Sequence, residues 1–151
     1  MDAPALPGRA FAVRIGKGCP MAATTTQDRQ ENRRKVVLVV DDSVELLDAV
    51  RLMLEPRFDV LQASDAFAGV RLAATHEPDA IVMDLDMPGM DGVEAMRYLK
   101  RIDQTRDIPV IAFTGHALTT AARRRGFERI VTKSGNLEAL EIEIEDVLHA
   151  A

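Results

Sequence analysis

The chain has 151 residues, 47% of them hydrophobic, which suits one folded domain with an ordinary core and leaves no room for a second. Its net charge of -5 argues against nucleic acid as the main partner. The single cysteine excludes an internal disulfide, and no apolar run approaches the roughly 18–20 residues of a transmembrane helix. We therefore expect a cytoplasmic protein with no membrane insertion.

The first 33 residues differ in composition from the rest of the chain. Pro and Gly recur through the first twenty positions and interrupt any signal-peptide core, and residues 24–34 are polar and charged. Such a segment buries too little apolar surface to offset its ordering entropy. We expect residues 1–33 to form a disordered tail and residues 34–151 to form the folded domain, with either Met1 or Met21 as the natural start.

The first strand is predicted at residues 36–40, VVLVV, a β-branched run typical of a parallel strand that is covered on both faces. The run ends in Asp41 and Asp42. Ser43 is placed to cap a helix that Pro56 stops. The expected inward face of this helix comprises Val44, Leu47, Val50 and Leu54.

A second strand is predicted at residues 58–61, followed by a helix that either Ser64 or Asp65 caps and that ends before Pro78. The apolar residues of this helix are Phe67, Val70 and Leu72. An unbroken apolar run at 80–83 then predicts a third buried strand, which ends in Asp84. Turn chemistry follows, with a proline that fixes one φ angle and glycines at 89 and 92 that tolerate conformations other residues resist.

The remaining segments continue the alternation of helices and strands. In order, we expect a helix at 92–101, a strand at 109–113, a short helix at 117–125, a brief strand at 130–131 and a final helix from about 137. The final helix turns Leu140, Ile144, Val147 and Leu148 inward. This alternation predicts an α/β fold with a doubly wound parallel sheet between two helical layers.

Polar groups follow four of the predicted strands: Asp41 and Asp42, then Asp84, Thr114 and Lys133. The carboxyl ends of parallel strands share one edge of the sheet, where open α/β sheets bind ligands. Crowded carboxylates without His or Cys nearby favour Mg²⁺. The metal, an ammonium and a hydroxyl would together stabilise a phosphoryl group transferred to an aspartate.

Four segments make the chain resemble the receiver domains of two-component response regulators over residues 35–150. VVLVVDDS resembles the first strand and acidic pair of that family, IVMDLDMPGMDG its phosphoacceptor segment, PVIAFTG its Thr-bearing strand and VTK its lysine. The resemblance implies a flavodoxin-like (βα)5 fold with strand order 2-1-3-4-5. It also implies phosphotransfer to Asp84 from a histidine kinase or a histidine phosphotransfer protein.

The same resemblance implies roles for individual residues. The Mg²⁺ ligands would be Asp41, Asp42, Asp84 and the backbone of Asp86. Thr114 and Lys133 would contact the phosphoryl oxygens. Asp86 and His116 occupy the variable positions that affect how long the phosphoryl group survives, although a lone histidine in a loop is equally consistent with a solvated side chain.

Three departures from the family lie in the half of the domain that reports its state. Ile130 replaces the usual aromatic switch residue, and Ser134 replaces the proline that commonly follows the lysine. Thr114 and Lys133 are also closer in sequence than is common, so the fourth helix should be short or partly irregular. The phosphoacceptor set is complete, whereas the route of conformational output is altered.

The chain ends directly after the last predicted helix, so we expect a stand-alone receiver that signals by protein-protein interaction to a downstream target. It would not be an enzyme beyond its own phosphorylation and slow autodephosphorylation, and its oligomeric state is left open. One alternative is a phosphorylation-independent interaction module with a receiver fold. Another is a phosphatase of the haloacid-dehalogenase type, because Asp84 and Asp86 form a DxD pair, but Pro88 does not suit that motif.

Overall fold

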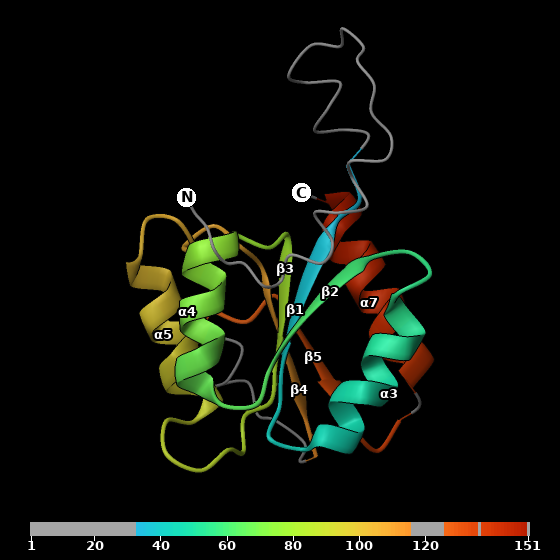
Figure 1. Cartoon of the computed structure of the whole chain (residues 1–151), viewed down its shortest axis with the longest axis horizontal. Helices are drawn as coiled ribbons and strands as arrows, with labels where there is room; N and C mark the ends of the chain where they lie inside the picture. The colour runs from blue at the N-terminus through green and yellow to red at the C-terminus, as the bar shows by residue number, and fades with distance from the viewer. Residues whose placement is uncertain (1–32, 116–125, 136, 151) are drawn as a thin grey trace, which may run out of the picture. The chain divides into compact units, whose positions relative to one another are not determined.

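A five-stranded parallel sheet with strand order β2-β1-β3-β4-β5 forms the centre of the computed structural model, which describes residues 33–115, 126–135 and 137–150 (Figure 1). The strands are β1 (Val36–Val40), β2 (Asp59–Ala63), β3 (Ala80–Met83), β4 (Val110–Thr114) and β5 (Arg129–Thr132). The predicted strand order and parallel sheet are confirmed. The predicted strands at 58–61 and 109–113 are each displaced by one or two residues, as is common for element ends.

Helices cover both faces of the sheet. The four described helices are α3 (Val44–Leu54), α4 (Ala66–His76), α5 (Gly92–Arg101) and α7 (Leu137–Ala150). Figure 1 shows α4 and α5 side by side on one face and α3 with α7 on the other, which gives the expected three layers. The helix predicted at 117–125 and the boundary predicted at residue 33 lie in or against segments outside the described residues, so both stay predictions.

The main core lies between the sheet and the helices α3 and α7. Every residue of β1, β3 and β4 is buried, as expected for central parallel strands with both faces covered. The core residues that α7 contributes are Leu140, Ile144 and Val147, with Leu148 packed at the edge. Among the described residues, no helix has the length and apolar character needed to cross a membrane.

Three of the described helices, α3, α4 and α5, begin with a side-chain cap. Ser43 accepts a hydrogen bond from the Leu46 amide, Asp65 from the Ala68 amide and Asp91 from the Glu94 amide. These caps satisfy amides of the first turn that have no partner within the helix. The choice between Ser64 and Asp65 is thereby decided in favour of Asp65.

The predicted apolar faces of α3 and α4 were partly wrong. Val44 is 61% exposed and Phe67 is 65% exposed, although both were placed in apolar sets. Helix α4 instead buries Ala66, Gly69 and Ala73. The reason is close packing against β1, because a Cβ atom added at Gly69 would lie 2.8 Å from Val40 Cγ2. Small residues therefore face the sheet, and larger ones such as Phe67 lie outside.

Arg57 and Arg129 contact acidic residues of α7. Arg57, in the turn before β2, pairs with Glu145 and lies 3.8 Å from Glu141. Arg129, at the start of β5, pairs with Glu143 at 3.0 Å and Asp146 at 2.6 Å. Acidic residues of α7 thus connect this helix to the turn before β2 and to the start of β5.

Candidate functional site

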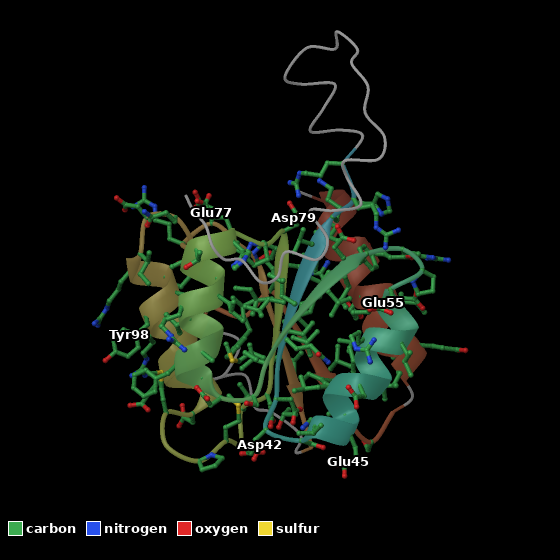
Figure 2. The ribbon with its side chains drawn as sticks, in the orientation of Figure 1. Asp42, Glu45, Glu55, Glu77, Asp79 and Tyr98 are labelled. Carbon is green, nitrogen blue, oxygen red and sulfur yellow. The ribbon has the colours of Figure 1, made fainter. Side chains whose placement is uncertain are left out.

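The candidate site lies at the edge where the carboxyl ends of the strands meet. Asp41 follows β1 and Asp84 follows β3, and the Asp84 amide donates to the Val40 carbonyl at 2.9 Å. On the other side, the Lys133 amide donates to the Thr114 carbonyl at 2.7 Å. Figure 2 shows Asp42 at this end of the sheet, opposite the end that carries Asp79. The parallel sheet therefore brings together residues that are far apart in sequence.

Three carboxylates form the centre of this edge. One carboxylate oxygen from each of Asp41, Asp42 and Asp84 lies within 4.8 Å of the others. Asp41 is 1% exposed and Asp84 is 2% exposed, whereas Asp42 is exposed to solvent. Such crowding is electrostatically unfavourable unless positive charge compensates it.

Lys133 supplies positive charge to the carboxylates. Its Nζ atom lies 2.7 Å from Asp41 Oδ2 and 3.4 Å from Asp84 Oδ1. Burial by itself would lower the pKa of this ammonium, but the hydrogen bonds and negative charges of Asp41 and Asp84 outweigh burial and raise the pKa above its ordinary value. Lys133 therefore stays positively charged and close to both buried carboxylates.

The Asp84 carboxyl group has a raised pKa. Its burial is the largest cause, and the nearby charge of Asp41 acts in the same direction. The Asp86 amide, which donates to Asp84 Oδ1 at 3.2 Å, and the Lys133 ammonium partly offset this rise. Asp84 is thus a buried carboxylate that accepts a hydrogen bond from the Asp86 amide and lies beside the Lys133 ammonium.

Asp41 is held by the start of α3 as well as by Lys133. Its Oδ1 atom accepts a hydrogen bond from the Ser43 amide at 2.9 Å. This contact fixes the first member of the acidic pair, while Asp42 remains at the surface. The pair therefore comprises one buried, fixed carboxylate and one solvent-facing carboxylate.

Thr114 and Asp86 are connected by a contact that the sequence did not indicate. The Thr114 hydroxyl, at the end of β4, donates to Oδ2 of Asp86, an exposed residue in the loop after β3, at 3.4 Å. Motif spacing places each residue near the site but carries no information on whether their side chains meet. His116 lies outside the described residues, so its predicted influence on phosphoryl lifetime stays a prediction.

Two residues that depart from the family pattern, Ile130 and Ser134, lie in and just after β5. Ile130 is half-buried within β5, and Ser134 is exposed, with its hydroxyl 3.2 Å from Thr132 Oγ1. No cis peptide bond occurs among the described residues, in line with the absence of a proline at position 134. The substitutions at these two positions leave β5 paired with β4 in parallel register.

The donor set of the site fits a magnesium ion. The three clustered carboxylates offer only oxygen ligands, which is the set that Mg²⁺ prefers over softer metals. Two of the three are buried beside each other, so a divalent cation would relieve the repulsion between them. The residues present therefore satisfy the chemical requirement for the predicted metal.

Comparison with known proteins identifies the family. The model of the response regulator receiver domain matches residues 37–145. Protein PilH of Pseudomonas aeruginosa is 36% identical over 116 residues, covering 74% of this chain and 96% of PilH. The polar-differentiation response regulator DivK of Brucella anthropi is 31% identical over 103 residues, covering 66% of this chain and 84% of DivK.

Some relatives are much longer than the matched region. Protein-glutamate methylesterase/protein-glutamine glutaminase 1 of Cereibacter sphaeroides is 34% identical over 128 residues, which cover 76% of this chain but 34% of that protein. The chain therefore spans about a third of the length of this curated relative.

Solved structures agree with this assignment. The receiver domain of Francisella response regulator 1452 superposes with a TM-score of 0.71 at 25% identity, covering 77% of this chain and 98% of that one. Vibrio cholerae chemotaxis protein CheY4 has the same fold, with a TM-score of 0.71 at 24% identity over 76% of this chain and 99% of that one. The flavodoxin-like fold is thus confirmed, and the chain belongs to the response regulator receiver domain family.

Proposed function

We propose that the protein accepts a phosphoryl group on Asp84 from a histidine kinase or a histidine phosphotransfer protein. The observation that carries this proposal is the position of Asp84: a buried carboxylate 3.4 Å from the Lys133 ammonium and clustered with two further carboxylates. A covalent carboxylate nucleophile needs compensation for the charge of the incoming phosphoryl group. Lys133 supplies one positive charge, and the acidic cluster offers a binding site for a metal cation.

The reaction exchanges one bond to phosphorus for another. An Asp84 carboxylate oxygen attacks the phosphorus of the phosphohistidine, the P–N bond breaks, and the imidazole leaves with the bonding electron pair and takes up a proton. The product is an acyl phosphate on Asp84 and no redox partner is needed. Lys133 neutralises the charge on the transferred oxygens, and Thr114 donates its hydroxyl to one of them once it leaves Asp86.

Magnesium would be held by Asp41, Asp42, Asp84 and the backbone of Asp86. When bound, the ion would supply positive charge that compensates the negative charge of the phosphoryl oxygens. Backbone amides of the protein position the carboxylates of the site. The Ser43 amide fixes Asp41, and the Asp86 amide orients one Asp84 oxygen.

Labelling of Asp84 tests the proposal. Acetyl phosphate with Mg²⁺ should add the mass of one phosphoryl group to the wild-type protein and none to Asp84→Asn. Asp103→Asn is the matched control because Asp103 is a solvent-exposed aspartate in the loop after α5. Labelling of Asp84→Asn equal to that of the wild type, or an unlabelled wild type, would refute the assignment.

Output through another protein is the second part of the proposal. PilH and DivK are matched over most of their own length, which supports the proposal that the receiver domain acts by binding a protein partner. Ile130 and the exposed Ser134 alter the region that family members use for output, so a phosphorylation-independent interaction module remains the competing reading. Phosphoryl labelling of the wild-type protein that leaves its affinity for a protein partner unchanged would favour that interpretation.

A further inference from the structure

We propose that Gly92 is a positioning residue for the phosphoacceptor, because the absence of a side chain there sets where the Asp84 backbone lies. This inference rests on the proposed phosphorylation of Asp84. Gly92 is the first residue of α5, and Figure 1 shows α5 starting near the carboxyl ends of the strands. The expectation that Gly92 supplies an unusual backbone conformation was wrong, since only Gly89 and Gly126 have positive φ angles among the described glycines.

Gly92 instead permits an unusually close approach of two backbone segments. A Cβ atom added at Gly92 would lie 2.3 Å from the Asp84 carbonyl oxygen and 2.9 Å from Leu85 Cα. It would also lie 2.8 Å from Leu85 Cδ2. Because the two backbone atoms cannot swing aside as a side chain can, a methyl group there requires the segments themselves to separate.

The required separation is large on the scale of the site. Carbon and oxygen atoms in contact lie about 3.3 Å apart, so the start of α5 and the Asp84 carbonyl would have to move apart by about 1 Å. Both segments are anchored. The Asp84 amide is bonded to the Val40 carbonyl, and α5 is held by the fully buried Ala95 and Met96.

The Gly92 amide adds a second connection to the same loop. It donates to the Leu85 carbonyl at 3.3 Å, while the cap residue Asp91 accepts from the Glu94 amide at 2.9 Å. The start of α5 is therefore fixed to the residue that follows the phosphoacceptor. A displacement at Gly92 is transmitted to Asp84, whose carboxylate has to stay near Lys133 to react.

The test compares Gly92→Ala with Gly69→Ala. Both variants remove a helical glycine and overfill a buried contact, but a Cβ atom at Gly69 meets only side-chain atoms of Val40, the nearest at 2.8 Å. We expect the maximal labelling rate with acetyl phosphate to fall roughly 100-fold in Gly92→Ala, as about 1 Å of misplacement does in other active sites. The KM for acetyl phosphate should change little, and Gly69→Ala should label at the wild-type rate.

Each other result has a defined meaning. Wild-type labelling rates in Gly92→Ala, or an equal loss in Gly69→Ala, would overturn the positioning role while leaving the proposed function intact. An unlabelled wild type would instead refute the proposed function. If Gly92→Ala does not fold, the double variant Leu85→Ala/Gly92→Ala relieves the side-chain contact but keeps the contact with the Asp84 carbonyl, and the same loss of rate is expected.

Discussion

Asp41, Asp84 and Lys133 form the charged centre of the candidate site. Asp84 is buried beside Asp41, and Lys133 lies closer to Asp41 than to Asp84. The pKa of Asp84 is raised chiefly by burial, which means that its ionised form is less stable in the folded chain than in water. A carboxylate kept in this state is available for chemistry, but it lowers the free energy of unfolding.

Replacing Asp84 with Asn should therefore stabilise the metal-free protein at neutral pH. The substitution removes a buried charge and its repulsion from Asp41 but keeps the shape of the side chain. Each kcal/mol regained raises Tm by roughly 2–4 °C in a chain of this size. Thermal unfolding in chelator measures the difference, with the exposed Asp103→Asn as a control that should unfold at the wild-type temperature.

The stabilisation expected for Asp84→Asn should decrease as the pH falls. The pKa of Asp84 is higher in the folded than in the unfolded state. The ionised carboxylate therefore lowers the free energy of unfolding at pH values above the raised pKa. This destabilisation disappears as the pH falls through the raised pKa, because the carboxyl group of the folded chain takes up a proton. The Tm advantage of Asp84→Asn should shrink on acidification from neutral pH. An advantage that grows on acidification would contradict burial as the cause.

At the scale of elements, local chemistry predicts where helices begin better than which face they bury. The position of Ser43 directly after β1 and the acidic pair predicts a helix cap, and Ser43 does cap α3. The apolar face predicted for α4 is wrong because an apolar side chain such as Phe67 is buried only if the sheet leaves space for it. The tight approach of Gly69 to Val40 leaves none, and this distance is a property of the packed structure rather than of the helix sequence.

The cap of α4 gives a test with a matched neighbour. Asp65 accepts from the Ala68 amide at 2.8 Å, so Asp65→Ala leaves an amide of the first turn without its partner and should cost about 1 kcal/mol of stability. The adjacent Ser64→Ala should cost a small fraction of that, because Ser64 is exposed and is not the cap. Urea unfolding at neutral pH measures both, and equal losses would show that the capping bond contributes nothing specific.

At the scale of the whole molecule, the sequence predicts topology well because strands and helices alternate and each buried strand is nearly all apolar. It also predicts that Asp41, Asp84, Thr114 and Lys133 meet, because parallel strands align their carboxyl ends. Contacts that depend on the direction of individual side chains cannot be predicted from the order of strands and helices. The hydroxyl of Thr114 on Asp86 and the empty Cβ position of Gly92 follow only from the assembled fold.

Magnesium should stabilise the whole domain, because the acidic cluster joins the ends of β1 and β3 and exists only in the folded chain. A ligand at 100 times its Kd adds about 2.7 kcal/mol to the free energy of unfolding. We expect Tm to rise in MgCl₂ above its value in NaCl of equal ionic strength.

In Asp42→Asn the exposed ligand is lost while the buried contacts of Asp41 and Lys133 remain, so this variant should keep its metal-free Tm and lose most of the gain in Tm from MgCl₂. Equal Tm values in the two salts for the wild type would show that the cluster does not hold the ion, whereas a full gain in Asp42→Asn would place the ion away from the acidic pair.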